Sequence, residues 1–482
     1  MNTRSRNLFL AIFMIFPLWV FFPTPAHSQN QEFLKNPKDM TFPPLTFSPP
    51  KAVRTVLSNG ITLYLLEDSE LPLIQISALI RTGTIYDPPD KAGVADLTAT
   101  MLRTGGTSGR TPQEINEDLE FRAAEIEFSM NREFASASLS VRKKDFPQVL
   151  AIFIQMLMKP AFDPDQLDLA KKQAIEAIRR SNDDPEEVAY REFRKVLYEG
   201  NPRGLVPTIE SVASIQREDL IRFHRQFFLP NNVFLGISGD FKANEMIADL
   251  EKAFRDWPRS IMEFPPVPLP KRSREKSVCY VSKDLPQATI LIGHLSLPLL
   301  HPDHIPLQVL NYILGGGGFN SRLTREIRSN QGLAYSVGSY YQGRVGYGVF
   351  GAFCQTKSAT THKAISLIFE IIESLQTDKK PKPEELDWAQ KSLINQFIFS
   401  FTSSASVVTQ QMRLEYDDLP EDHLWKYQEH VAAVTLEELE RTARDHLHPD
   451  QAILLVVGKE EDFEKPLSLF GPVKQIFLKN SP

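Results

Sequence analysis

Two residues of this 482-residue chain, Arg328 and Tyr335, have side chains suited to binding and polarising a carbonyl group. They stand seven residues apart, on either side of a predicted helix-to-strand turn at Gly332. Arginine is a fixed cation with several N–H donors, and tyrosine has a hydroxyl donor. Neither is a metal ligand or an activated nucleophile here, so the pair can bind a peptide group but cannot cut it alone.

Three other segments could be taken for metal or nucleotide sites. Segment 301–304, His-Pro-Asp-His, precedes a predicted helix, so Asp303 is interpreted as an N-cap. Metal binding there would need a third and a fourth ligand. Segment 446–448, His-Leu-His, lies at a predicted helix C-terminus, where positive charge is favourable. The glycines 315–318 end a helix and lack the Lys-Ser/Thr of a phosphate loop, so they predict a turn that lets the next helix pack closely.

Composition and charge indicate a globular protein with more than one domain. The chain is 42% hydrophobic and 24% charged, with a net charge of −6. Both signs of charge are scattered along it, which excludes a basic stripe for nucleic acid. Cys279 and Cys354 each lie in an apolar, strand-like run and are expected to be buried free thiols. A disulfide between them is the alternative if the protein is exported.

The first residues predict export. Two arginines and the apolar stretch 8–22 precede small residues that end at Ser28, so residues 1–28 are expected to be a cleaved signal peptide. A retained membrane anchor is the alternative, but the apolar run is short of the ~20 residues that a spanning helix needs. We therefore expect a periplasmic protein with no stable membrane anchor after cleavage.

The remaining chain predicts two similar units of strands and helices. In the first unit, pairs of strands hinge on Asn59-Gly60 and on 131–132, which is typical of antiparallel hairpins. A comparable order of strands and helices returns after a Pro-rich stretch. The predicted fold class is α+β, with two homologous domains that are each a largely antiparallel sheet with helices packed on one face.

The predicted boundaries follow from these patterns. They are 1–28 for the signal peptide, 29–50 for an extended leader, 51–256 for the N-terminal domain, 257–276 for a Pro-rich linker, 277–465 for the C-terminal domain and 466–482 for a tail.

Two segments carry a family resemblance. Segment 81–107, RTGTIYDPPDKAGVADLTATMLRTGGT, and segment 314–339, which holds LGGGGFNSRL and GLAYSVGS, resemble the pitrilysin/insulinase-type zinc metallopeptidases. The resemblance covers nearly all of 51–465 and points to the bacterial branch related to mitochondrial processing peptidase. It implies two similar α+β domains per half, and two halves that close around a chamber.

The resemblance also implies a zinc motif, His-x-x-Glu-His, on the helix after Gly93. Two imidazoles at positions i and i+4 share one helix face and can hold zinc, while the glutamate activates the bound water. Here the three positions hold Asp96, Ala99 and Thr100, and the only candidate for the downstream acidic ligand is Glu176. Alanine cannot act as a base and threonine is a poor zinc ligand. We therefore expect no metal on this chain and zinc in a partner subunit.

In the family, an arginine and a tyrosine from the half opposite the zinc bind the substrate backbone, and the resemblance places these roles on Arg328 and Tyr335. The hypothesis is an exported non-catalytic subunit of a two-subunit zinc metallopeptidase, inactive alone, whose His-x-x-Glu-His homologue completes a composite site for peptide hydrolysis. The alternative is a catalytically inactive scaffold or peptide-binding protein. A self-sufficient peptidase is disfavoured, because no nucleophile, base and orienting group stand out.

Overall fold

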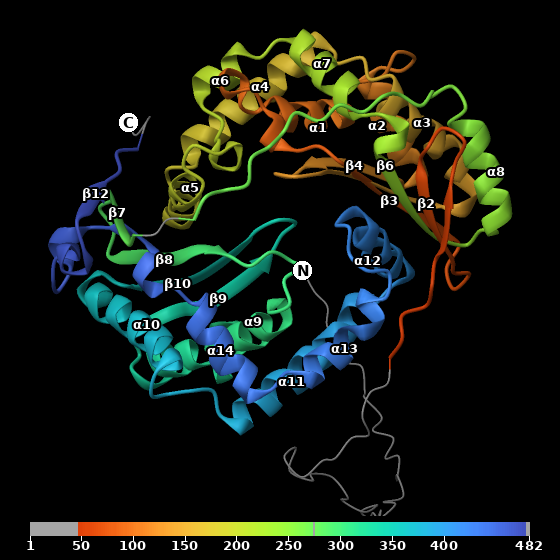
Figure 1. Ribbon diagram of the computed structural model, residues 1–482. Helices are drawn as coiled ribbons and strands as arrows, with labels where there is room; N and C mark the ends of the chain where they lie inside the picture. The colour runs from red at the N-terminus through yellow and green to blue at the C-terminus, as the bar shows by residue number, and fades with distance from the viewer. Residues whose placement is uncertain (1–46, 273–274, 479–482) are drawn as a thin grey trace, which may run out of the picture. The chain divides into compact units, whose positions relative to one another are not determined.

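Two six-stranded sheets organise the chain, one in each half of the residues that the computed structural model describes, 47–272 and 275–478 (Figure 1). The expected signal peptide and most of the leader lie outside these residues. The strand order is β1-β2-β6-β3-β5-β4 in the first sheet and β12-β7-β11-β8-β10-β9 in the second. The strands are β1 (Val53–Val56), β2 (Thr62–Glu67), β3 (Leu73–Ile80), β4 (Glu125–Met130), β5 (Ala135–Arg142), β6 (Val233–Gly239), β7 (Ser277–Ser282), β8 (Gln287–Ser296), β9 (Ala334–Gly343), β10 (Gly348–Lys357), β11 (Ile453–Gly458) and β12 (Val473–Gln475).

The two sheets are copies of one plan. β2 is parallel to β6, as β7 is to β11, while the next three pairs in each sheet are antiparallel. Only the outer strand differs, since β1 is antiparallel to β2 but β12 is parallel to β7. The prediction of two homologous, largely antiparallel α+β domains is confirmed.

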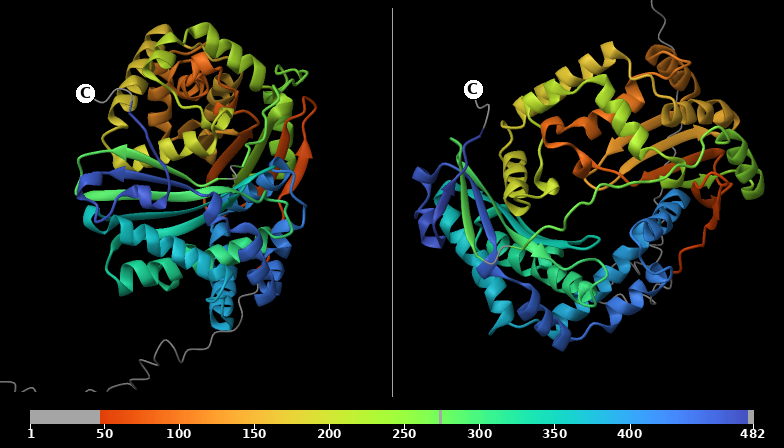
Figure 2. Two further views of the ribbon diagram at one scale, coloured as in Figure 1. Left: turned by 60° about the vertical axis from the view of Figure 1, so that its left-hand side comes forward. Right: turned by 45° about the horizontal axis from the view of Figure 1, so that its top comes forward.

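Helices fill the connections between the strands and pack mainly on one face of each sheet (Figure 2). Those of the first half are α1 (Val94–Thr104), α2 (Pro112–Arg122), α3 (Phe146–Met158), α4 (Pro164–Arg180), α5 (Pro185–Leu197), α6 (Ile209–Ser214), α7 (Arg217–Phe227) and α8 (Ala243–Ala253). Those of the second half are α9 (His304–Asn311), α10 (Thr361–Gln376), α11 (Pro383–Ile398), α12 (Ser404–Tyr416), α13 (His423–Ala433) and α14 (Leu436–His446).

Local sequence signals account for many of these boundaries. Thr111 begins α2 with a reciprocal capping box, in which its backbone N–H donates to Glu114 at 2.8 Å and the Glu114 N–H donates back at 3.3 Å. The hairpins at Asn59-Gly60 and at 131–132 form as predicted. Between α10 and β11 the chain forms four more helices, α11 to α14.

One helix of each half also packs on the sheet of the other half. α12 packs on β6, β2 and β3 of the first sheet, and α5 packs on β11 and β8 of the second. Glycines in the receiving strands make room for this exchange. A side chain at Gly236 would collide with Val408 of α12, and one at Gly293 would press on Phe193 of α5. The two halves are therefore joined by exchanged helices as well as by the linker.

The ends of the described chain are packed on this body. The segment expected to be a tail contains β12, which extends the second sheet, and Phe470, whose ring lies 4.7 Å from that of His362. The prediction of a separate tail from residue 466 was therefore wrong, because pairing with β7 satisfies its backbone groups. Near the end of the leader, Phe47 lies against Phe401, with 5.4 Å between ring centroids.

Cys279 and Cys354 are both buried and free. They lie on β7 and β10, which are separated by β11 and β8, so the strand order keeps the two sulfurs too far apart for a disulfide. The expectation of buried free thiols is confirmed. Of the helices between residues 47 and 478 that the structure describes, none combines the length and apolar character needed to cross a bilayer.

Candidate functional site

Helix α1 carries the positions at which the family resemblance implies zinc ligands. Asp96 and Thr100 are exposed on one helix face, while Ala99 is only 3% exposed. The Thr100 hydroxyl donates to the backbone oxygen of Asp96 at 3.0 Å. These side chains offer one carboxylate and no imidazole, which does not fit the ligand set of a catalytic zinc site.

The expected downstream acidic ligand, Glu176, does not supply the zinc ligands that α1 lacks. Glu176 lies on α4, which packs on α1, but its carboxylate forms ion pairs with Arg179 and Arg180 at 3.5 and 3.1 Å. Both partners are themselves solvent-exposed. The side chain therefore belongs to a surface ion-pair cluster.

Two aspartates govern the electrostatics around α1. The buried Asp87 carboxylate accepts hydrogen bonds from the N–H groups of Gly93 and Ala95 at 2.7 and 2.9 Å, which closes the helix N-terminus. Burial nevertheless raises the pKa of Asp87 to about 7. The protein packed around Asp96 raises the pKa of its carboxyl to about 6 by partial desolvation, even though the side chain is exposed at one side, and the positive charge of Arg194 opposes this shift.

Arg328 and Tyr335 are brought together as the sequence predicts. Arg328 lies on the π-helix η9 (Thr324–Asn330), and Tyr335 is the second residue of β9. The guanidinium carbon of Arg328 is 4.8 Å from the ring centroid of Phe319 and 5.3 Å from that of Tyr335. Phe319 is 67% exposed and Tyr335 is 81% exposed. No ion pair within residues 47–272 and 275–478 involves Arg328, so its charge is held between two exposed rings.

The glycines before this cluster set its position. After α9 the chain continues as the π-helix η7 (Tyr312–Gly316), where a side chain at Gly315 would collide with the backbone of Ser339 in β9. A side chain at Gly317 would collide with Trp388 of α11. Gly318 has a φ of +64° and begins the turn that carries Phe319. The glycines therefore allow close packing, as predicted, and both elements that follow them are π-helices or short turns instead of the predicted α-helix.

The described structure does not bring the two candidate regions of this chain together. Asp96 and Thr100 lie on α1 in the first half, and Arg328 and Tyr335 lie beside β9 in the second, with no hydrogen bond, ion pair or ring contact between the two sets.

In segment 301–304, Asp303 is the N-cap residue of α9 as predicted, but its side chain has partners that the sequence did not predict. Asp303 makes no side-chain cap at α9, but accepts two hydrogen bonds from Arg441 at 2.8 and 2.5 Å and contacts Nε2 of His446 at 2.7 Å. His301 completes a cluster of three potential metal ligands. Because both carboxylate oxygens already bind the guanidinium of Arg441, a cation would have to displace that group. Asp303 occupies the N-cap position of α9 as predicted, but its side chain makes no capping hydrogen bond, because a buried carboxylate gains more from charged donors than from backbone N–H groups.

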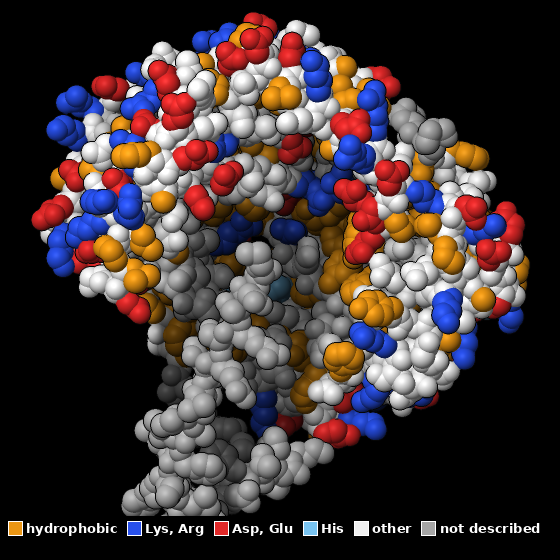
Figure 3. All heavy atoms as spheres, turned by 180° about the vertical axis from the view of Figure 1, so that it is seen from behind, with side chains coloured by type: hydrophobic (Ala, Val, Ile, Leu, Met, Phe, Trp, Pro, Cys, Tyr) orange, Lys and Arg blue, Asp and Glu red, His pale blue; other side chains and the backbone are white. Residues whose placement is uncertain are grey.

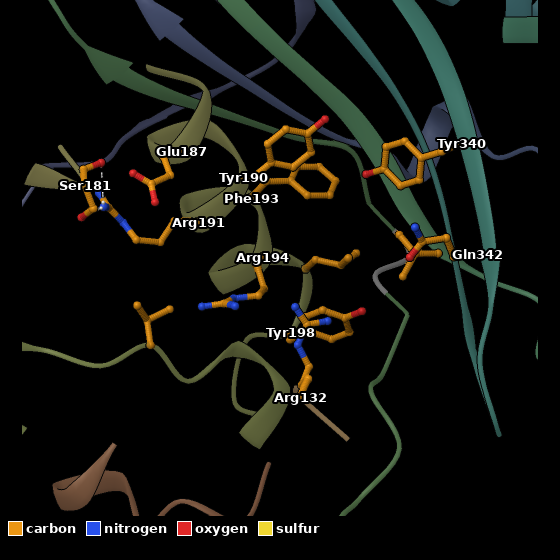
Figure 4. A pocket seen from close by; sticks show the side chains of 13 residues that line it. Arg132, Ser181, Glu187, Tyr190, Arg191, Phe193, Arg194, Tyr198, Tyr340 and Gln342 are labelled. Atoms are coloured by element: carbon orange, nitrogen blue, oxygen red, sulfur yellow. Dashed lines mark hydrogen bonds between the residues drawn. The ribbon is translucent and has the colours of Figure 1, made fainter. Parts of the chain in front are cut away.

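A pocket of about 530 Å³ is the feature that the sequence did not indicate. It lies between α5 and the strands β9 and β10, and Arg132, Arg191 and Arg194 line it together with aromatic side chains (Figure 4). Its arginines come from a hairpin turn and a helix, and no pattern in the sequence joins these two elements.

Comparisons with known proteins match this architecture. The family model described as "Insulinase (Peptidase family M16)" matches residues 65–206, and that described as "Peptidase M16 inactive domain" matches residues 214–393. Together they cover about two thirds of the chain. The chain belongs to the insulinase family of peptidases. The family predicted from the two sequence segments is thereby confirmed.

Several relatives are similar over most of their length. "Uncharacterized zinc protease YmxG" of Bacillus subtilis is 24% identical over 409 residues, which cover 84% of this chain and 97% of that protein. "Non-peptidase homolog YmxG" of Helicobacter pylori is 25% identical over 403 residues, 82% of this chain and 91% of that protein. "Mitochondrial-processing peptidase subunit beta" of Dictyostelium discoideum is 19% identical over 329 residues, which cover 64% of this chain and 68% of that protein. Both a non-peptidase and a subunit of a peptidase therefore occur in this family.

A solved structure shares the fold. The crystal structure of a peptidase M16 inactive domain from Pseudomonas fluorescens has a TM-score of 0.80 and 23% sequence identity, covering 87% of this chain and all of that one.

Proposed function

We propose that this chain is a non-catalytic, exported subunit of a two-subunit zinc metallopeptidase. The observation that carries the proposal is the half-buried cation of Arg328, held between the exposed rings of Phe319 and Tyr335 without a carboxylate partner within the described residues. A surface arginine with only a structural role would gain little from two rings that are themselves exposed. The arrangement instead leaves the N–H donors of the guanidinium and the phenol hydroxyl available to a ligand.

The geometry suits recognition of a peptide bond. The guanidinium donates to carbonyl oxygens of the substrate backbone, and the Tyr335 hydroxyl donates to the oxygen that becomes negative as the bond is attacked. The water that attacks would be activated at a zinc ion bound by a His-x-x-Glu-His motif on a homologous partner subunit. This chain, with Asp96, Ala99 and Thr100 at the corresponding positions, would bind no metal itself.

The proposed partner and location rest on different observations. A family member that is named as a peptidase subunit supports an assembly of two homologous chains. The basic and apolar pattern of residues 1–28 supports export to the periplasm. Mass spectrometry of the periplasmic fraction should find a mature chain that begins at Gln29, and an intact N-terminus would contradict export by cleavage.

Peptide hydrolysis by the co-expressed pair tests the composite site. The partner is a homologue that carries His-x-x-Glu-His, and Arg328→Ala and Tyr335→Phe are made in this chain. Tyr335→Phe should lower turnover by about 10²–10³-fold, which is the usual effect of removing one oxyanion donor. Arg328→Ala should lower turnover through loss of the contact with the substrate backbone, and the zinc content of the pair should stay the same in both variants. Arg325→Ala is the matched control, because Arg325 lies on the same π-helix but faces Glu385 at 3.9 Å.

The second candidate is an inactive scaffold or peptide-binding protein, which the non-peptidase relative favours. In that case the partner would hydrolyse peptides equally well with the wild-type chain and with both variants. Unchanged turnover in Arg328→Ala and Tyr335→Phe would therefore reject the composite site in favour of the scaffold.

A further inference from the structure

The pocket between the two halves contains an arginine whose charge has no partner. Nε of Arg194 is inaccessible to water and has no hydrogen-bond partner within the described residues, and no ion pair there involves this side chain. Burial lowers the pKa of Arg194, and the positive charges of Arg132 and Arg191 act in the same direction. An unpartnered guanidinium in such a place is costly unless an anion joins it.

The neighbouring groups do not neutralise this charge. Arg132 lies over the ring of Tyr198, with its guanidinium carbon 5.4 Å from the ring centroid, and has no carboxylate partner in the described chain. Arg191 is occupied by Ser181, by Asn182 and by Glu192 at 2.9 Å.

Two carboxylates lie near the pocket without pairing with Arg194. Asp96 favours the charged form of Arg194 from a distance, without a hydrogen bond. Glu187 lines the pocket and is exposed. Arg132 and Arg194 thus line the same pocket without a carboxylate partner within the described residues.

The other walls of the pocket indicate what kind of anion fits. Figure 4 shows side chains of α5 on one side and Tyr340 and Gln342 of β9 on the other. The walls also include Phe193, Leu197 and Val349, which are buried and apolar. Figure 3 shows a hollowed face on which Lys or Arg side chains gather beside hydrophobic ones. About 530 Å³ is a typical size for a small-ligand site, and these walls suit an apolar side chain next to the charged group.

We infer that this pocket binds a carboxylate of a peptide, held by Arg194 and Arg132, with an adjacent apolar side chain packed against the aromatic wall. The carboxylate could be the C-terminus of the peptide or an acidic side chain, because a guanidinium fork binds either one bidentately. The inference deepens the proposed function, on which it rests for the choice of peptides as ligands. It assigns this chain a share in selecting peptides, separate from the contact made by Arg328 and Tyr335.

Fluorescence anisotropy with the purified chain, without a partner, tests the pocket. The probes are N-terminally labelled Ala-Ala-Ala-Phe as the free acid and as the amide, and Ala-Asp-Ala-Phe amide, which carries only a side-chain carboxylate. We expect at least one of the two carboxylate probes to bind about 10- to 100-fold more tightly than the uncharged amide, as expected for a charge-assisted contact. Equal binding of all three probes would overturn the inference. It would also be overturned if inorganic phosphate displaced the free-acid peptide and bound as tightly as that peptide does.

Substitutions locate the effect in the pocket. Arg194→Met should abolish the preference for a carboxylate, and Arg132→Gln should weaken it. Arg179→Ala, which removes an exposed guanidinium of α4, should leave it unchanged. Arg194→Met should also keep or raise the melting temperature, because it removes a half-buried charge without a partner, whereas a structural role for Arg194 would lower it.

The outcome is independent of the composite site. Arg328→Ala should leave the preference for a carboxylate unchanged. The effect of Arg194→Met is measured as peptide binding to this chain in the absence of a partner. A preference that persists in Arg194→Met would reject the pocket and leave the composite site standing. Unchanged turnover in Arg328→Ala would do the reverse.

Discussion

The helices α1 and α9 follow equivalent strands, β3 and β8, yet they lead to different chemistry. α1 is a regular α-helix in which seven of eleven residues are buried, including Leu97 and Ala99. α9 has eight residues and continues into a π-helix and a run of glycines that positions the cluster around Arg328. Packing therefore explains why α1 forms, whereas the exposed rings of Phe319 and Tyr335 and the half-buried cation of Arg328 gain little from packing.

This difference shows that a helix can form whatever side chains its exposed face carries. Asp96 and Thr100 point away from the core, so their identity has little influence on whether α1 forms. The buried positions of the same helix bind it to the sheet whatever the exposed residues are. A preserved helix is therefore no argument for a preserved site, while an exposed cluster without a packing role is one.

The starts of α1 and α9 also differ in the electrostatics of a buried aspartate. Asp87 at the start of α1 meets only backbone N–H groups, and burial raises its pKa to about 7. Asp303 at the start of α9 meets Arg441 and His446, and these donors, Arg441 first, lower its pKa to about 2. The equivalent helix starts are thus stabilised in opposite pH ranges.

The largest effect should come from the core of α1. Leu97→Ala should lower the free energy of unfolding by about 2–5 kcal/mol, because Leu97 is 3% exposed and its loss leaves a cavity. Denaturant titration measures this. Asp96→Ala on the exposed face should change stability by no more than about 0.5 kcal/mol. A stable Leu97→Ala would show that packing does not explain α1.

The cluster in the second half should show the reverse behaviour. Tyr335→Phe should reduce kcat of the pair by about 10²–10³-fold with KM nearly unchanged, because the hydroxyl acts on the oxygen that becomes charged. Stability should stay within about 0.5 kcal/mol, since Tyr335 is 81% exposed. A loss of stability that matches the loss of turnover would assign this residue a structural role.

The start of α9 should contribute a stability that depends on acid. Asp303→Asn should lower the free energy of unfolding at pH 7 by about 1.5–3 kcal/mol through lost charged hydrogen bonds. Because the pKa is lowered to about 2, the contribution is present above about 4 and is lost as pH falls through 2, so the two proteins should converge there. Asp445→Asn on α14, whose carboxylate pairs with the exposed Arg444, is the control and should have little effect.

The smallest effect should come from Asp96. Its pKa is raised to about 6, so any stability from the uncharged form is present below about 4 and is lost as pH rises through 6. Relative to Asp96→Asn, the wild type should lose less than about 1 kcal/mol over this range, because water reaches the carboxylate. Chemical denaturation between pH 4 and 7 measures the difference in stability between the wild type and Asp96→Asn. Because Asp87 is present in both proteins, its own pH-dependent contribution cancels in this difference. A difference that does not vary with pH would contradict the raised pKa.

Sequence reasoning predicted the elements better than their partners. The hairpin at Asn59-Gly60 is a local signal, and its prediction was correct; the capping box at Thr111 also depends only on residues close together in the sequence. β12 was missed because a three-residue strand has no pattern of its own and forms only by pairing with β7. The exchange of α5 and α12 between the halves was not predicted either, because an amphipathic helix does not specify which sheet it covers.

The candidate residues divide in the same way. The sequence alone determined that α1 lacks imidazoles and a base, and that Arg328 and Tyr335 flank one turn, because residue type and short spacing decide both. Only the tertiary structure decided that Asp303 binds Arg441, that Cys279 and Cys354 stay apart, and that Arg194 and Arg132 line one pocket between the halves. These contacts join segments far apart in the chain, and their charges and distances exist only once two sheets and the exchanged helices have packed.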